Sequence, residues 1–344
     1  MGALIEGEPR TLDDVFVLAE SIGLLVEIFE IDGTWYRVPL DGGKPSDLSG
    51  AYCLSEFLLG SGVRVIVGML CNWKLGREER LTLEGIKGVS AEDMREARKR
   101  SREAVEAGKV AKALQHEETA ARADKIWAGL PDEGRSPYLQ SKGVKAYGLR
   151  FSRGSIVVPA RDIDGKLWTL QFINKDGGKL FLSGGAKRGR FHLIGRLPDK
   201  GQALSAVGVA EGYATAEAGF TAAAKAFPMA VAFDAGNILP VSEAFRARYP
   251  EARIIIFADH DVHKGYPVAL IKRRDITPAL QVQIDRLARV RPDVAVEVAA
   301  NDDPRFSDKD KHYNVGVTKA LIAAAAVDGD VLVPRFDPLK EAAL

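Results

Sequence analysis

Two short apolar segments that end in acidic residues constrain this chain more than any other feature. Residues 207–210 read Val-Gly-Val-Ala and are followed by Glu211; residues 254–258 read Ile-Ile-Ile-Phe-Ala and are followed by Asp259 and Asp261. Short continuous apolar runs of this kind are typical of strands buried on both faces of a parallel sheet. Because ligands of an open parallel sheet bind at the carboxyl ends of its strands, we expect the three carboxylates to meet at one edge. A site with only oxygen ligands favours a hard cation such as Mg²⁺ or Mn²⁺.

The segments after residue 201 predict an α/β domain. Strands are expected at residues 207–210, 229–233, 253–258 and 294–299, with helices after Glu211, at 242–249 and at 276–289 between them. This alternation predicts a parallel sheet of about four strands flanked by helices, joined by right-handed crossovers. The residues after about 333 are expected to form a loose tail.

Positive charge is concentrated just before this domain. Between residues 142 and 196 there are twelve Lys or Arg and three Asp, a net charge of +9, whereas residues 201–333 carry fifteen basic and seventeen acidic residues. Within the basic stretch, two apolar segments joined through an Asp-Gly turn predict a β-hairpin at about 155–174. The basic residues gather at glycine-rich turns and strand edges. This favours a polyanion-binding surface beside a metal site; a merely solvated face is the alternative.

The first 130 residues predict two further parts. Residues 11–30 have helical apolar spacing after Asp13 and Asp14 as candidate caps, and strand and turn material follows at 35–76. From Ser90, paired with Asp93 as a reciprocal cap, a run rich in Ala, Glu, Lys and Arg predicts a charged linker helix. Direct contact of its arginines with nucleic acid is the alternative. The expected domains are a small α+β domain at 1–88, the linker at 89–130, a basic β-rich subdomain at 131–200, the α/β domain at 201–333 and a tail at 334–344.

Composition narrows the class of protein. Two cysteines, Cys53 and Cys71, and five histidines form neither a disulfide framework nor a zinc-ligand pattern in the 344 residues. No apolar run reaches the roughly 18 residues of a membrane span, and no signal pattern opens the chain. We therefore expect a cytoplasmic protein that does not contact a membrane. No phosphate-binding loop of the Walker type occurs, so a helicase would have to be a separate chain.

Several motifs resemble a known family. Glu211-Gly-Tyr-Ala-Thr-Ala, followed by Ala258-Asp-His-Asp, resembles the Toprim domain, the metal-binding α/β module of DnaG-type primases, topoisomerases and some nucleases. The Ala-Thr-Ala variant is similar to primases of conjugative plasmids, integrative elements and phages. Upstream segments resemble, in the same order, the front half of a primase core, so the resemblance covers about residues 131–330; they begin at Tyr138, Val158, Gly178 and Phe191. Residues 35–76 more faintly resemble the zinc-ribbon region of such primases, without its metal ligands.

The resemblance implies roles for individual residues. Glu211 would act as general acid/base or metal ligand, and Asp259 and Asp261 would hold divalent ions. Thr215 stands where chromosomal primases have Asp, and His312 and Val315 stand where the family's late motif has acids. Asp308 or Asp310 would substitute there, with Asp310 taken as the further metal ligand. The residues expected to bind nucleotide or nucleic-acid phosphate are Arg161, Lys179, Lys187, Arg188 and Arg190.

The function implied by the resemblance is that of a DNA primase. Such an enzyme synthesises short oligoribonucleotides from nucleoside triphosphates on single-stranded DNA by two-metal nucleotidyl transfer with Mg²⁺ or Mn²⁺. The replication of a plasmid, phage or mobile element is the expected setting, with a separate replicative helicase as a further partner. Two alternatives remain: a Toprim nuclease that uses the same acids to activate water, and a catalytically degenerate primase that binds DNA as a replication accessory protein.

Overall fold

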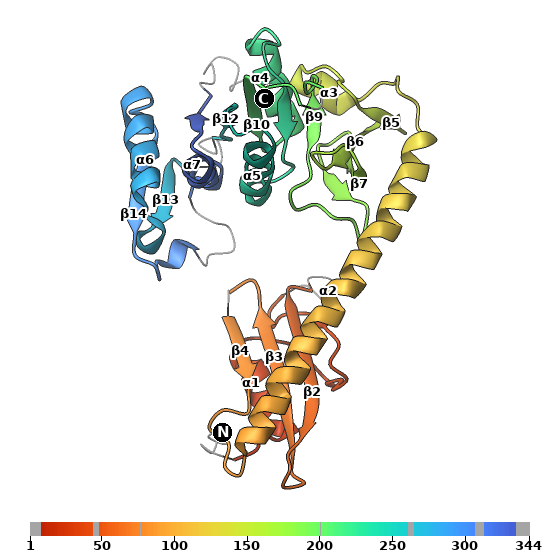
Figure 1. Cartoon of the computed structure of the whole chain (residues 1–344), viewed down its shortest axis with the longest axis vertical. Coiled ribbons are helices and arrows are strands. Elements are labelled where there is room, and N and C mark those ends of the chain that lie inside the picture. Colours follow the sequence, from red (N-terminus) through yellow and green to blue (C-terminus); the bar gives the residue numbers. More distant parts are fainter. Residues whose placement is uncertain are drawn as a thin grey trace. The chain divides into compact units, whose positions relative to one another are not determined.

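The chain has a mixed α/β fold, as predicted. The computed structural model describes residues 8–43, 48–75, 77–199, 201–260, 265–306 and 313–334. The chain divides into two compact units, residues 1–110 with 304–311, and residues 111–303 with 312–344 (Figure 1). In the described ranges no helix combines the length and the apolar character needed to cross a membrane.

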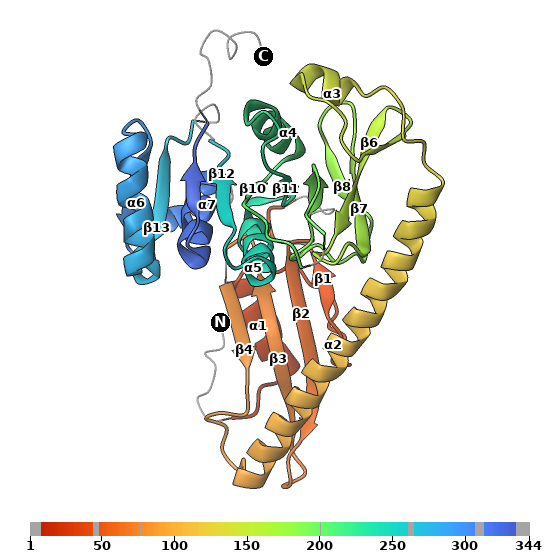
Figure 2. The same cartoon turned by 45° about the horizontal axis from the view of Figure 1, so that its top comes forward.

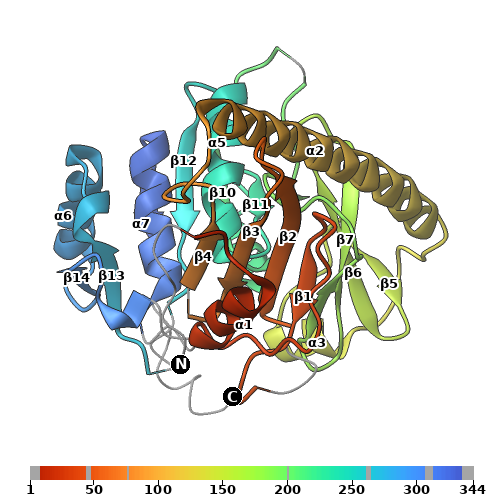
Figure 3. The same ribbon diagram turned by 90° about the horizontal axis from the view of Figure 1, so that it is seen from below.

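The first unit is built on a four-stranded antiparallel sheet. Its strands β1 (Tyr36–Val38), β2 (Gly50–Leu58), β3 (Arg64–Asn72) and β4 (Arg77–Leu81) lie side by side in chain order. Helix α1 (Leu12–Ser21) packs on one face of the sheet, where Val15 and Ala19 join a core with Leu54 and Leu70 (Figure 3). The start of helix α2 (Ala91–Ala128) packs on the other face, through residues such as Met94.

The two predicted helices of this region differ in outcome. Helix α1 ends at Ser21 instead of near residue 30, because Gly23 takes a φ of +74° and the chain then enters a bridge between Leu24 and Leu40. Its N-cap is Thr11, and the side chain of Asp14 accepts from Thr11 N in return, so the predicted cap is confirmed for Asp14 but not for Asp13. The long charged helix is confirmed as α2.

The cap of α2 is the predicted one. Ser90 and Asp93 bond each other's backbone N–H groups: Asp93 Oδ2 accepts from Ser90 N at 2.8 Å, and Ser90 Oγ accepts from Asp93 N at 3.1 Å. The second oxygen of Asp93 accepts from Gly60 N at 2.7 Å, so the cap also holds the turn after β2. Two orphan donors at the helix start are thereby satisfied.

The second unit opens with the basic β-rich region. After helix α3 (Pro137–Lys142), strands β5 (Arg150–Ser152), β6 (Ser155–Arg161), β7 (Leu167–Ile173) and β8 (Lys179–Phe181) form an antiparallel sheet in chain order. The predicted hairpin is confirmed as β6 and β7. Asp162 Oδ1 accepts from the backbone N–H groups of Asp164 and Lys166, which closes the turn between these strands.

The α/β region follows, with a five-stranded sheet in the order β15-β12-β10-β11-β9. Strands β10 (Ala206–Ala210), β11 (Met229–Val231), β12 (Arg253–Phe257) and β15 (Asp330–Leu332) are parallel, and β9 (His192–Ile194) runs antiparallel to β11. Alternate residues of β10 face opposite layers. Val207 and Val209 join the core of α5 (Ile238–Arg248), α6 (Pro278–Val290) and α7 (Val315–Val327), whereas Ala210 joins that of α4 (Tyr213–Ala222) and β6 (Figure 2).

The number of parallel strands is the predicted one, but the fourth strand is not. Residues 294–299 were expected in the main sheet, whereas they supply β14 (Ala295–Ala299), which pairs with β13 (Val268–Lys272) in a separate two-stranded sheet. Ala295, Glu297 and Val298 are exposed, so β14 is not a strand buried on both faces. The fourth parallel strand is β15, whose three residues are too few to show an apolar pattern.

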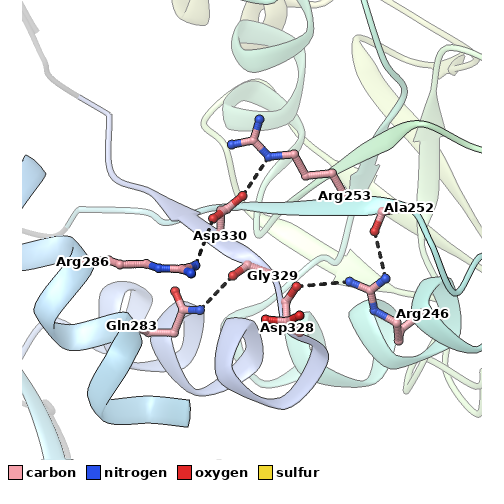
Figure 4. Close-up of polar contacts among 8 residues, drawn as sticks. All are labelled: Arg246, Ala252, Arg253, Gln283, Arg286, Asp328, Gly329 and Asp330. Carbon is pink, nitrogen blue, oxygen red and sulfur yellow. Dashed lines mark hydrogen bonds and ion pairs between the residues drawn. The ribbon is translucent and has the colours of Figure 1, made fainter.

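Arginine side chains explain how such a short strand is held in the sheet. Arg246 of α5 donates to the carbonyl oxygen of Val327 at 2.8 Å. It also donates to that of Asp328 at 3.2 Å (Figure 4), and Asp328 takes a φ of +47° between α7 and β15. Arg253, at the start of β12, donates to the carboxylate of Asp330 at 2.8 Å. These long-range bonds supply the order that the local sequence of β15 lacks.

Candidate active site

Acidic residues follow neighbouring parallel strands at one edge of the five-stranded sheet. Glu211 comes directly after β10 and Asp259 lies two residues after β12; Ala210 pairs with Phe257 between these strands. Both carboxylates are half-buried, at the edge where the sequence placed them. Asp234 lies three residues after β11 and adds a third acid that the sequence analysis missed. Asp261, Asp308 and Asp310 lie outside the described residues.

Thr215 holds the carboxylate of Asp259. It stands in the first turn of α4, and its hydroxyl donates to Asp259 Oδ1 at 2.8 Å. A neutral donor therefore occupies the position at which the resembling chromosomal primases carry an acid. This hydrogen bond fixes the orientation of the Asp259 carboxylate.

The start of α7 packs directly against Asp259. A Cβ atom on Gly316 would overlap the carbonyl oxygen of Asp259 and lie 3.2 Å from its Cβ atom. Next to it, the buried Asn314 caps α7 by accepting from Val317 N, and its Nδ2 lies 2.7 Å from His260 Nδ1. The late motif thus positions the segment that carries Asp259, through a glycine and an amide instead of through acids.

Lys179 joins the basic sheet to this acidic edge. An ideal Cβ atom on Gly212 would lie 3.7 Å from Lys179 Nζ, so the ammonium group at the start of β8 reaches the first turn of α4, beside Glu211. The side chain remains exposed. A cation at a helix N-terminus is not placed there for helix stability, because the macrodipole is positive at that end. Its position suits an anion that both the ammonium and the N–H groups can bind.

Asn237 fixes the basic loop, residues 187–190, to the end of β11. Its Nδ2 donates to the carbonyl oxygens of Arg190 at 2.9 Å and Lys187 at 3.3 Å, and its Oδ1 accepts from Gly189 N at 2.7 Å. The side chain is only 3% exposed. Lys187 Nζ in turn lies 2.5 Å from Asp234 Oδ2. The sequence feature that could have pointed to Asp234 and Asn237 is the polar segment Asp-Ala-Gly-Asn, which directly follows a buried apolar run.

The remaining predicted phosphate-binding residues lie farther along the basic region. Arg161 donates to the carbonyl of Gly165 at 2.8 Å, and the Arg190 guanidinium lies 4.5 Å from the ring centroid of Trp168. Arg188 is exposed. The structure describes no bond between these arginines and the acids at the strand ends. Of the five predicted basic residues, Lys179 and Lys187 are thus the ones brought to the acidic edge.

Tyr138 of α3 adds a buried phenol near Asp259. Burial raises the pKa of Tyr138 above its usual value, and the negative charge of Asp259 raises it further. The hydroxyl is therefore a neutral donor at physiological pH. It lay within a motif that the sequence analysis quoted, without a role of its own.

The donor set suits a hard divalent cation. Across the described ranges, no cluster of three or more Asp, Glu, His or Cys side chains is placed to hold a metal ion. Magnesium, however, is usually held by one or two carboxylates and completes its shell with waters and substrate phosphates. Glu211 and Asp259, at neighbouring strand ends beside a cationic group, match that chemistry.

Comparison with known proteins shows the relatives of this chain. A protein named DNA primase TraC from Escherichia coli is 34% identical over 316 residues, which cover 90% of this chain and 24% of that protein. A second Escherichia coli protein of the same name is 35% identical over 244 residues, 68% of this chain and 16% of the relative. The chain is homologous to part of DNA primase TraC. It spans about a quarter or less of the length of these TraC relatives, and no family model matches it.

Solved structures add little to the homology with TraC. The primase fragment of the bacteriophage T7 primase-helicase protein has a TM-score of 0.26 and 17% identity, covering 51% of this chain and 66% of that one. The structure of bacteriophage T7 lagging-strand DNA polymerase interacting with primase domains of two gp4 subunits has a TM-score of 0.26 and 16% identity. This match covers 47% of this chain and 72% of that one.

Proposed function

We propose that this chain is a DNA primase that synthesises short oligoribonucleotides on single-stranded DNA. Homology to TraC supplies the class of reaction. The observation that supports it best is the position of Lys179, which brings the basic sheet to the acids at the strand ends. A polymerising site needs a cationic surface for template and triphosphate next to carboxylates for a cation, and a nuclease of the same fold need not carry that surface.

A divalent cation, Mg²⁺ or Mn²⁺, would be held by Glu211 and Asp259, with Asp261 and Asp310 as the further proposed ligands. When bound, such a cation eases deprotonation of a ribose 3′-hydroxyl and neutralises the triphosphate. Thr215 orients the carboxylate of Asp259 through its hydrogen bond. Glu211 would act as general acid/base or as a further ligand, at the end of β10.

The basic residues bind phosphates in this proposal. Lys179 holds a triphosphate at the head of α4, where the helix N–H groups add to the attraction. The loop with Lys187, Arg188 and Arg190, together with Arg161, contacts the backbone of the template, so template affinity falls as salt rises. The partners are single-stranded DNA, nucleoside triphosphates and a separate replicative helicase, in the replication of a plasmid or related mobile element.

The test incubates the whole chain with single-stranded DNA, labelled ribonucleotides and Mg²⁺ or Mn²⁺. We expect short labelled oligoribonucleotides, and their complete loss when EDTA removes the cation, with restoration by excess Mn²⁺. Shortened template would instead identify a metal-dependent nuclease. Binding of DNA without either product would identify an accessory protein, and each of these two results refutes the proposal.

Asn237 offers a test of the basic loop. Asn237→Ala removes the bonds that hold residues 187–190, so we expect the affinity for single-stranded DNA to fall about tenfold and the free energy of unfolding by about 2–3 kcal/mol. Fluorescence anisotropy and thermal unfolding measure the two effects.

The matched control is Ser242→Ala in helix α5, which begins directly after Asn237. Ser242 is fully buried and donates to the carbonyl of Ile238 at 2.8 Å, so its loss also removes a buried bond but leaves the loop intact. We expect this variant to lose about 1 kcal/mol of stability and to keep its DNA affinity. Equal DNA affinities in both variants would show that Asn237 acts on stability alone.

A further inference from the structure

We infer that the first unit carries a base-stacking site for single-stranded nucleic acid, formed by Trp35, Arg37 and Trp73. Trp35 and Trp73 are 51% and 45% exposed, and the centroids of their indole rings lie 6.5 Å apart with planes tilted by 29°. Arg37 places its guanidinium 4.1 Å from the centroid of Trp73. We call these three side chains the indole platform. It lies within the first unit and uses no residue of the acidic edge.

The strand register explains why these side chains share a face. Trp35 and Arg37 stand two residues apart at β1, so they point to the same side, while Tyr36 between them points to the opposite side and stacks on Tyr52 of the core. Arg37 pairs with Ala51 of β2, and Ala51 pairs with Cys71 of β3. Trp73 follows two residues later, fixed by its backbone N–H on Ser49 O at 3.2 Å.

Small side chains in the middle of this face leave room for the rings. Ala51 occupies the central strand between Arg37 and Cys71, and it is fully buried. Arg37 is held in place by its Nε, which donates to Leu48 O at 2.9 Å. The Arg37 side chain and the backbone of Trp73 are therefore both held by hydrogen bonds to the segment before β2.

Helix α2 packs on the same face toward its other end. There Met94 and Ala97 pack on a cluster that contains Phe57 and Val65. The core around α1 lies on the opposite face of the sheet. Neither Trp35 nor Trp73 belongs to the two buried clusters that pack on the faces of this sheet. Exposed aromatic side chains of this kind mark binding surfaces.

The chemistry favours single-stranded nucleic acid. Flat indole faces stack on any unpaired base, and an arginine on the same face pairs with phosphate or stacks in its turn. Arg80 adds a second cation on this face. It pairs with Met69, and Met69 pairs with Cys53, so Arg80 lies in the cross-strand row of side chains next to the row of Arg37. The carboxylate of Glu78 lies 3.8 Å from the Arg80 guanidinium. Bases in a duplex are stacked on one another, so duplex DNA has no free faces to offer.

This inference deepens the proposed function, since it assigns the template a second contact, but it depends on different residues. The test measures the affinity of the whole chain for an oligothymidylate of about 20 nucleotides, longer than the roughly 4–16 nucleotides of common single-strand sites. We expect Trp35→Ala and Trp73→Ala each to weaken binding about tenfold, without changing the weak affinity for duplex DNA. Arg37→Gln should also lower the salt dependence of binding.

Two controls separate binding from folding. Trp35→Tyr with Trp73→Tyr keeps flat aromatic faces and should restore most of the affinity, whereas Leu58→Ala removes another exposed side chain of the unit, 59% exposed on β2, and should change nothing. Unchanged affinity in the two alanine variants at unchanged melting temperature overturns the inference and leaves the surface to a protein partner. Failure of the tyrosine pair to restore binding also overturns it.

The outcome is distinguishable from failure of the proposed function. If the wild-type chain makes no oligoribonucleotide but the alanine variants lose affinity for single strands, the platform stands and primer synthesis does not. If primers are made and the alanine variants bind single strands normally, primer synthesis stands and the indole platform does not. In an active protein we expect the variants to raise the KM for template and to leave kcat unchanged, because the platform touches no reacting atom.

Discussion

Asp259→Asn is expected to lower primer synthesis about 100-fold or more while the protein stays folded. Asparagine has nearly the same shape, and its oxygen can still accept the hydrogen bond that Thr215 donates at 2.8 Å. What is lost is the negative charge at the end of β12, on which a divalent cation and the electrostatic stabilisation of the reaction depend. The measurement is the rate of oligoribonucleotide formation at saturating template and nucleotide.

The control for this substitution is Glu243→Gln, which removes one charge from an exposed position of α5 in the same unit. We expect its activity to remain within about twofold of the wild type, because exposed charges far from a site contribute little. Asp259→Asn should keep its affinity for single-stranded DNA. It should also melt at the same or a slightly higher temperature, since one of several like charges at the edge is removed. Normal activity in Asp259→Asn would rule out the proposed site.

The sequence predicted those parts of the fold that local patterns determine. The strands before Glu211 and Asp259 are continuous apolar runs, and the β6–β7 hairpin has an Asp-Gly turn, so each carries its own signal. Helix α2 has a reciprocal cap at Ser90. Each of these elements could be recognised without knowing what it packs against.

The errors concern elements that distant contacts decide. Strand β15 has three residues and is held by Arg246 and Arg253, which lie about eighty positions earlier in the chain. The segment 294–299 has strand propensity, but propensity does not name the partner, and it pairs with β13. The number of parallel strands was therefore predicted correctly while one of them was misidentified.

The same division applies to the candidate site. The acids at the strand ends were predictable because the edge of a parallel sheet collects them. The contacts that position them were not: Thr215 bonds Asp259 from 44 residues away, and Asn237 bonds Arg190 from 47 residues away. A single sequence shows which groups can bind, but not which distant group each will meet.

Gly316 illustrates such a contact and leads to the second large effect. Gly316→Ala is expected to lower primer synthesis about tenfold or more, because the new methyl group would overlap the carbonyl oxygen of Asp259 and force that segment to move. Overpacking of this kind costs about 1–3 kcal/mol of stability. A displacement of about 1 Å at a catalytic carboxylate can lower a rate about 100-fold. Enzyme rate and melting temperature are measured together.

The matched control is Gly108→Ala, another glycine-to-alanine change inside a helix. Apart from its chain neighbours and the backbone of its own helix, no described atom lies within 4 Å of a Cβ atom at Gly108. The expected effect there is the better helix propensity of alanine, about 1 kcal/mol in favour of the folded state. We expect this variant to keep full activity and to melt at the same or a higher temperature. If Gly316→Ala behaves in the same way, α7 does not position Asp259. If only Gly316→Ala loses activity while it still binds single-stranded DNA, the start of α7 controls the geometry of the acidic edge. The late motif would then contribute to activity by positioning Asp259, although it contains no acids.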